Sequence, residues 1–339
     1  MKKNLKKIFI TLVFILITFS LAALIFFQNL KNFSRTPASS SDSTEIIVLI
    51  NKGDTFNKTL NKLRKKQLIS NSLKFKIFAK LSKKEKKIQS GEYGLNKTMT
   101  PEQILNILVS GSVKLRKITI PEGHTISQIS DILENKNICS KKEFIKYAFN
   151  RNLLKKFNIP GLSFEGYLFP ETYLFEKNTH PEVIIKKMIE NFFKNYSKEF
   201  SKKASELGLS DHEIITLASI IEKETGQKEE RTVISSVFHN RLKKNMKLET
   251  DPSVIYGIKN FDGNITRADL KKETPYNTYI IKGLPPGPIA NPGLKSIKAA
   301  LYPAKTDFLF FVSKKDGTHY FSKTYSEHKM AVKKYQLGR

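Results

Sequence analysis

The amino-acid sequence predicts an α+β protein with a single N-terminal transmembrane helix, then small strand–helix units, then a mixed α/β region. Three observations carry this prediction. Residues 8–27 form an uncharged apolar run. A strand–turn–helix pattern begins at Ile47 and again at Lys117, and residues 211–225 have the periodicity of an amphipathic helix. With 339 residues, the chain has room for about two or three compact units.

The apolar run at residues 8–27 has the length of a membrane-spanning helix, which needs about 20 residues. Lysines crowd the segment before it, and Lys31 and Arg35 follow it. The positive-inside rule therefore predicts a cytoplasmic N-terminus, with everything from about residue 30 onward outside the cytoplasmic (inner) membrane. No small-x-small cleavage site closes the run, which favours an uncleaved anchor over a signal peptide.

The composition is strongly basic, with 59 Lys and Arg against 31 Asp and Glu and a net charge of +28. The excess is scattered lysine, which favours a general attraction to polyanions such as anionic lipid or wall polymers. The alternative is compositional drift with solvated lysines. Sequence-specific nucleic-acid binding usually needs concentrated arginine, and the predicted anchor argues further against a nucleic-acid partner.

No cofactor or metal site is expected from the sequence. Cys139 is the single cysteine, so no disulfide framework can form, and its apolar register predicts a core position. His212 and Glu213 begin like the zinc motif H-E-x-x-H, but Thr216 stands where the second histidine would be.

The two copies of the strand–turn–helix pattern cover residues 47–56 and 117–126, each followed by a helix. A glycine marks each turn, and Thr55 and Thr125 are the expected N-caps. Between the copies, Thr100 followed by proline predicts another helix start. The first copy, V-x-x-x-K-G-D-T-F, resembles the opening of LysM-type peptidoglycan-binding modules.

Residues 164–173, FEGYLFPETY, combine aromatic rings with carboxylates. Sugar sites use both, because sugar C–H faces pack on rings while hydroxyls need acceptors. The alternative is an aromatic corner of the core, which the spacing favours.

The helix predicted over residues 211–225 carries two glutamates near its end. At about 100° per residue, Ile214, Leu217 and their neighbours form one buried face, and Glu222 and Glu224 flank it on opposite edges. The glutamates are therefore not a facing pair. Each lies at a core boundary, where desolvation raises a carboxyl pKa and makes a usable general acid. The alternative is ordinary solvation at a helix end, and the pattern alone does not choose between the two residues.

Residues 217–258 and 268–312, together with the segment EGYLFPETY at 165–173, resemble the endolytic murein transglycosylase family. The resemblance covers nearly the whole chain beyond residue 44. It implies cleavage of the β-1,4 bond between N-acetylmuramic acid and N-acetylglucosamine within nascent peptidoglycan strands. The product ends in 1,6-anhydro-N-acetylmuramic acid, because the muramyl C6 hydroxyl attacks instead of water, and the cut terminates glycan elongation.

The resemblance also implies roles for individual residues. Lytic transglycosylases carry their acid in a Glu-Ser dipeptide, and Glu224-Thr225 is the nearest match. Glu224 is thus the implied catalytic acid and base, with Thr225 as its local partner and Glu222 as a supporting residue. The implied substrate-binding residues are Tyr276 and Asn277 of the PYNTY motif, together with Asn240, Arg241, Asp251 and Tyr256.

These inferences divide the chain into a cytoplasmic tail (1–7), a transmembrane helix (8–27), a polar tether (28–44), a LysM-like domain (45–112), a second α/β subdomain (113–204) and a catalytic domain (205–339). The expected partners are peptidoglycan strands, lipid of the cytoplasmic membrane and peptidoglycan synthases. Two other functions stay open: a non-catalytic peptidoglycan-binding scaffold, and a muramidase that hydrolyses the same bond with water.

Overall fold

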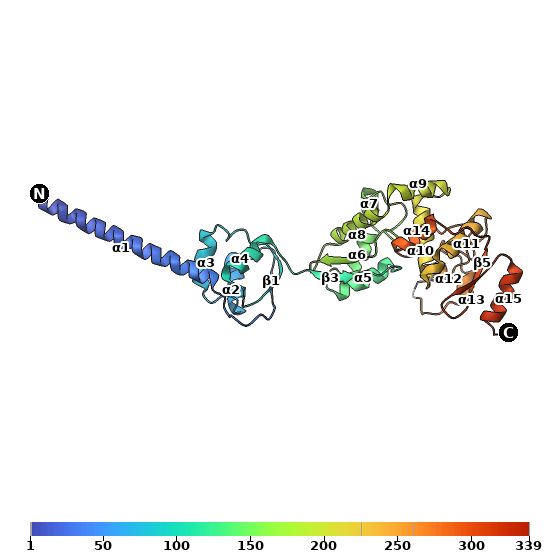
Figure 1. The fold of residues 1–339 in the computed structure, drawn as a ribbon, viewed down its shortest axis with the longest axis horizontal. Helices are drawn as coiled ribbons and strands as arrows, with labels where there is room; N and C mark the ends of the chain where they lie inside the picture. Colours follow the sequence, from blue (N-terminus) through green and yellow to red (C-terminus); the bar gives the residue numbers. More distant parts are fainter. Residues whose placement is uncertain (1, 225, 260, 339) are drawn as a thin grey trace. The chain divides into compact units, whose positions relative to one another are not determined.

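The computed structural model describes residues 2–224, 226–259 and 261–338. The chain divides into two compact units, Met1–Leu115 and Arg116–Arg339 (Figure 1). The predicted α+β class is confirmed, since helices dominate and the strands of the described residues pair only in two-stranded antiparallel sheets.

The first unit contains one long helix and a small strand–helix arrangement. Its elements are α1 (Lys2–Arg35), β1 (Ile46–Ile50), α2 (Phe56–Lys65), α3 (Ser72–Leu81), β2 (Gly91–Leu95) and α4 (Pro101–Ser110). β1 pairs with β2 so that Val48 lies opposite Tyr93, and both side chains are buried. The predicted helix starts are confirmed, because the hydroxyls of Thr55 and Thr100 accept hydrogen bonds from backbone N–H groups of α2 and α4.

Helix α1 is long and apolar enough to cross a membrane. It continues as helix through Arg35, and Leu30 and Phe33 are only 6% and 8% exposed in the core of the first unit. The structure differs here from the tether expected over residues 28–44. The first part of that segment is helical and packed, because Leu30 and Phe33 supply apolar surface that the small unit buries.

The second unit is larger and mostly helical. Its first elements are β3 (Arg116–Thr119), α5 (Ile126–Asn135), α6 (Lys141–Ala148), α7 (Arg151–Lys156), β4 (Thr172–Phe175), α8 (Pro181–Asn195) and α9 (Lys198–Glu206). They are followed by α10 (Asp211–Glu224), a 3₁₀ turn η1 (Lys228–Glu230), α11 (Arg231–Lys243), α12 (Asp251–Gly257), α13 (Arg267–Lys271), α14 (Leu294–Leu301), β5 (Phe310–Ser313), β6 (His319–Ser322) and α15 (Tyr325–Tyr335).

The predicted repeat of the strand–turn–helix pattern is confirmed. β1 leads through Gly53 into α2, and β3 leads through Gly123 into α5, with φ angles of +87° and +74° at the two glycines. Glycine adopts this left-handed backbone conformation with little conformational strain, because it has no Cβ atom. Thr125 caps α5 in a reciprocal capping box with Gln128.

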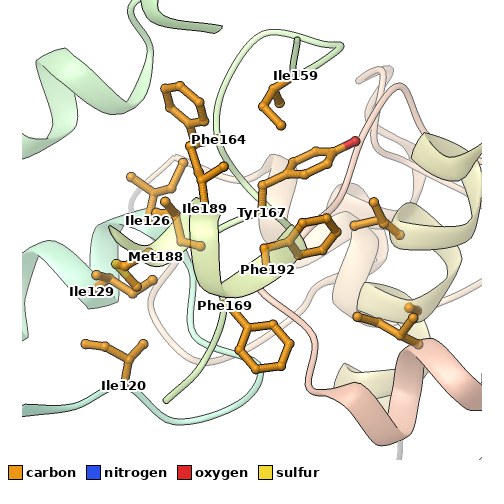
Figure 2. Close-up of a cluster of buried hydrophobic side chains, with 14 of the residues drawn as sticks. Ile120, Ile126, Ile129, Ile159, Phe164, Tyr167, Phe169, Met188, Ile189 and Phe192 are labelled. Carbon is orange, nitrogen blue, oxygen red and sulfur yellow. The ribbon is translucent and has the colours of Figure 1, made fainter. Parts of the chain in front are cut away.

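One apolar core runs through the second unit, from Ile118 to Leu301. Figure 2 shows part of it, where Phe164, Tyr167 and Phe169 lie among side chains from α5 and α8. The aromatic segment 164–173 is therefore a corner of the core, as its spacing favours. Cys139 is also buried in this core, as predicted. This single core contains residues from both sides of position 204. The predicted boundary between a subdomain at 113–204 and a catalytic domain at 205–339 therefore stays a prediction.

Helix α10 lies at the centre of this core, packed against α14 and α11. The sequence predicts one buried face, but every residue from Ile214 to Ile221 is buried. The two polar residues in this stretch are compatible with burial because their hydroxyls bond to the helix itself. Thr216 donates to the carbonyl of His212, and Ser219 donates to that of Thr216. The central helix thus delivers its last residues, Glu222 to Glu224, to the surface of the core.

Candidate functional site

A cavity of about 300 Å³ opens at the C-terminal end of α10. Its walls come from α10, α11, α12, β5, α15 and the loops beside them. The lining residues are Glu224, Arg241, Leu248, Glu249, Asp251, Tyr279, Phe311 and His328. The cavity therefore gathers carboxyl groups, an aromatic hydroxyl and an imidazole from segments more than a hundred residues apart.

Glu224 is the last residue of α10, and its side chain is partly buried. Burial raises the pKa of Glu224 to about 8, and the negative charge of Asp251 contributes to this rise. Among the described residues, none donates a hydrogen bond to its carboxyl group or forms an ion pair with it. The Glu224 carboxyl is therefore protonated at neutral pH and free to give its proton to a ligand in the cavity.

Asp251 is held in place from the loop that follows α13. It begins α12, and the Tyr279 hydroxyl donates a hydrogen bond of 2.7 Å to Asp251 Oδ1. Behind this pair, the buried Thr278 hydroxyl lies 2.8 Å from that of Ser253 and accepts a 3.0 Å bond from the backbone N–H of Thr250. This network locks the loop onto α12 and fixes the negative charge beside Glu224.

Arg241 forms another wall of the cavity and is 7% exposed. Its Nη1 donates to the carbonyls of Lys247 and Leu248 and to Glu249 Oε2, at 3.1, 3.0 and 3.0 Å. Its Nε donates to the carbonyl of Leu309 at 2.6 Å. The guanidinium therefore ties the segment before α12 to the segment before β5, and its donors are largely used in shaping the wall.

His328 approaches the cavity from α15 and stacks on Phe310, with ring centroids 5.2 Å apart. Burial lowers the pKa of His328, and the nearby Arg241 lowers it further. The ring is therefore neutral at pH 7. Its Nδ1 is buried and has no hydrogen-bond partner among the described residues.

Glu222 points to a different environment from Glu224. Arg231 Nη2 donates to Glu222 Oε1 at 3.0 Å, and the backbone N–H of Gly293 donates to Oε2 at 2.9 Å. The side chains of this ion pair are only 8% and 6% exposed. Glu222 thus joins α10 to the start of α11 and of α14, and its carboxylate is occupied.

The two asparagines in the predicted set bind backbone rather than the cavity. Asn277 is fully buried, and its Nδ2 donates to the carbonyls of Asp269, Leu270 and Lys272. Asn240 Nδ2 donates to the carbonyls of Thr306 and Phe308 at 2.8 and 3.0 Å. Both residues position loops around the site.

A second cavity of about 590 Å³ lies beside the first. Lys223 and Pro252 line it, while their sequence neighbours Glu224 and Asp251 line the smaller cavity. Tyr256 also lines it and contacts Tyr276, with ring centroids 4.8 Å apart and the ring planes tilted by 59°. The structure therefore places Arg241 and Asp251 with Glu224, and Tyr256 in the adjoining cavity. Thr225 lies outside the described residues.

Glu165 is a buried carboxyl in the wall of this larger cavity. It accepts hydrogen bonds from the backbone N–H of Ile126, from Asn291 Nδ2 at 2.8 Å and from the Tyr256 hydroxyl at 3.2 Å. Burial raises the pKa of Glu165 to about 8 against the effect of these donors. In each of these hydrogen bonds Glu165 is the acceptor, so its carboxyl group orients the donors around it.

Sequence reasoning did not select Tyr279, Glu249, Phe311, His328 or Glu165. Tyr279 and Glu165 lie inside the motifs PYNTY and EGYLFPETY. Considering every polar residue of these two motifs would have included both of them among the candidate site residues. Phe311 and His328 come from the C-terminal sheet and helix, and no local pattern marks them.

Comparison with known proteins identifies relatives of this chain. The profile of the YceG-like family matches residues 48–334. A Bacillus subtilis protein named endolytic murein transglycosylase is 36% identical over 88% of this chain and 87% of its own length. A Streptococcus pneumoniae protein of the same name is 28% identical, over 87% of this chain and 59% of its own. A crystal structure of a YceG-like protein from Listeria monocytogenes is 33% identical and superimposes with a TM-score of 0.60. The superposition covers 85% of this chain and 99% of the Listeria chain.

Proposed function

This chain belongs to the YceG-like family, and from that premise we propose that it is an endolytic murein transglycosylase. It cleaves the β-1,4 bond between N-acetylmuramic acid and N-acetylglucosamine inside peptidoglycan strands and leaves 1,6-anhydro-N-acetylmuramic acid ends. The observation that carries the proposal is Glu224, whose carboxyl group lines a cavity, has its pKa raised to about 8, and has no hydrogen-bond or ion-pair partner among the described residues.

Glu224 performs both proton transfers of this reaction. As the glycosidic bond breaks, its carboxyl proton passes to the leaving oxygen of N-acetylglucosamine. The resulting carboxylate then takes the proton of the muramyl C6 hydroxyl, and the C6 oxygen forms the new bond to C1. No water is consumed and no second nucleophilic carboxylate is needed, in contrast to ordinary glycosidases. The Asp251 carboxylate favours the protonated starting form of Glu224.

The residues around Glu224 support this step through the cavity wall, the end of α10, an aromatic pair and the loops beside the site. Arg241, Asp251 and Tyr279 build the cavity wall, and Glu222 fixes the end of α10 through Arg231. Tyr256 and Tyr276 form a tilted aromatic pair, and an aromatic ring there suits the C–H face of a neighbouring sugar. Asn240 and Asn277 act through the loops that they hold.

In this proposal α1 anchors the enzyme in the cytoplasmic membrane, with residues 1–7 in the cytoplasm and the second unit outside it. The four lysines before the apolar run support this orientation. The placement puts the enzyme where new glycan strands emerge and where peptidoglycan synthases work. Membrane lipid and those synthases are therefore its proposed neighbours.

The product ends test the proposed reaction. We expect the full-length protein in detergent to cut purified glycan strands internally, giving fragments whose mass corresponds to anhydro ends. Hydrated reducing ends, heavier by one water per cut, would instead show a muramidase that uses the same acid. Strands that stay intact while binding the protein would show a scaffold.

The pH dependence of cleavage tests the role of Asp251. Glu224 must be protonated to act as the acid, so kcat/KM should be level below pH 8 and fall as the pH rises through about 8. Asp251→Asn removes a negative charge that raises the pKa of Glu224, so this descending limb should move to lower pH. It should stay above the ordinary value of 4.5, because burial remains.

Asp262→Asn is the matched control for this experiment, since Asp262 is exposed and lies outside the cavity lining. Its profile should coincide with that of the unmodified enzyme. An Asp251→Asn profile that stays in place, or moves to higher pH, would contradict the electrostatic role of Asp251.

A further inference from the structure

The first unit is joined to the membrane-spanning helix without a flexible link. The predicted span ends at Phe27, and Leu30 and Phe33 of the same helix are already buried in the core of the unit. At about 1.5 Å per residue, Leu30 lies roughly 5 Å beyond Phe27 along the axis. Given the anchor proposed above, the near end of the first unit lies at the level of the lipid headgroups.

An apolar groove lies between α1 and α3 at this end of the unit, with a volume of about 490 Å³. This size falls within the roughly 300–1,000 Å³ of small-molecule sites. Its lining residues are Ala22, Ile25, Phe26, Asn29 and Leu30 of α1, and Lys74 and Ile77 of α3. The first three belong to the predicted span, so the groove begins at the depth of the acyl chains and ends at polar groups.

The polar end of the groove carries a positive charge. Lys74 Nζ donates a 2.6 Å hydrogen bond to Asn29 Oδ1, which leaves further donors of the ammonium group for a ligand. Leu73 beside it is 68% exposed. Residues 74–87 contain seven lysines and a single acidic residue, Glu85. Exposed apolar side chains among lysines are typical of surfaces that bind anionic membranes.

We propose that this groove binds one phospholipid with an anionic headgroup from the surrounding membrane. An acyl chain lies along Ala22, Phe26 and Ile77, and the headgroup phosphate meets Lys74. The inference rests on the proposed anchoring of α1. Charge complementarity selects the anionic lipid, and the continuity of the groove with the span gives the chain access from the bilayer.

Lipid retention by the full-length protein tests the site. The protein is reconstituted in nanodiscs with equal amounts of phosphatidylglycerol and phosphatidylcholine, extracted into detergent, and its bound lipid is measured by native mass spectrometry. We expect one phosphatidylglycerol to be retained in preference to phosphatidylcholine. Lys74→Glu should reduce that preference by about five-fold or more, since each lysine near a membrane surface contributes on that scale.

Two further variants separate the groove from general charge and from misfolding. Lys80→Glu makes the same charge change on the same helix, at an exposed residue outside the groove, and should retain the lipid. Ile77→Trp fills the groove, keeps Lys74 and should lower retention of both lipids. Equal retention of the two lipids by the unmodified protein, or an equal loss in Lys80→Glu, would overturn the proposal. Cleavage of soluble glycan by the same preparations reports separately on the proposed function.

Discussion

Glu224→Gln should abolish glycan cleavage, with a loss of about 10³-fold or more in kcat/KM, because in the proposed mechanism one side chain supplies both the acid and the base. Glutamine keeps the size of the side chain but can neither give the proton to the leaving oxygen nor take it from the C6 hydroxyl. The measurement is release of anhydro fragments from purified strands. Binding of the strands should persist, because the cavity walls are unchanged.

Glu222→Gln is the matched control on the same helix. Its carboxylate is bonded to Arg231 and to the N–H of Gly293, and a glutamine oxygen can still accept one of these bonds. We expect measurable cleavage from this variant. Full activity of Glu224→Gln together with an inactive, folded Glu222→Gln would reverse the assignment of the acid.

Glu222→Ala should lower the free energy of unfolding of the second unit by about 3 kcal/mol, the lower end of the range for breaking a buried ion pair, because Glu122 Oε2 still lies 3.9 Å from Arg231 Nη2 as a more distant counterion. Arg231 is 7% exposed, and its Nε and Nη1 already lack partners among the described residues. The loss of Glu222 also leaves the N–H of Gly293 unpaired. Urea unfolding, followed by circular dichroism, measures the change.

Glu229→Ala provides the comparison, because Glu229 is exposed in the neighbouring turn η1. A surface substitution of this kind usually changes stability by no more than about 0.5 kcal/mol. If Glu222→Ala unfolds at the same urea concentration as Glu229→Ala, the pair with Arg231 contributes no stability and the supporting role of Glu222 is wrong.

The parts of the fold that the sequence predicts are those with local causes. Thr55, Thr100 and Thr125 accept hydrogen bonds from residues three positions later, so a short pattern is enough to find them. The burial of α10 on every side has no such local cause. Thr216 and Ser219 are polar positions on a helical wheel, but their hydroxyls bond to backbone groups of the helix. Segments distant in the sequence cover the helix, and the backbone N–H of Ile289 donates to the Ser219 hydroxyl.

In the candidate site, too, the sequence predicts the local features and not those that depend on long-range packing. A helical wheel separates Glu222 from Glu224 but cannot say that Arg231 and Gly293 meet one of them while the other faces a cavity. The amides of Asn240 and Asn277 suit a sugar as well as a backbone carbonyl, so residue type alone does not distinguish a binding role from a structural one. His328 reaches the cavity from α15, and that approach is set by long-range packing.

The position of Glu224 as the last residue of α10 also affects how the enzyme recovers after each cut. The C-terminal end of a helix carries a partial negative charge, which disfavours a second negative charge there. In the proposed mechanism Glu224 gives up its proton, and the resulting carboxylate is destabilised by this partial charge until it takes a proton from the C6 hydroxyl. At the end of each turnover the substrate has therefore reprotonated Glu224. Because no proton has to come from the buffer, we expect the rate of cleavage to be independent of buffer concentration.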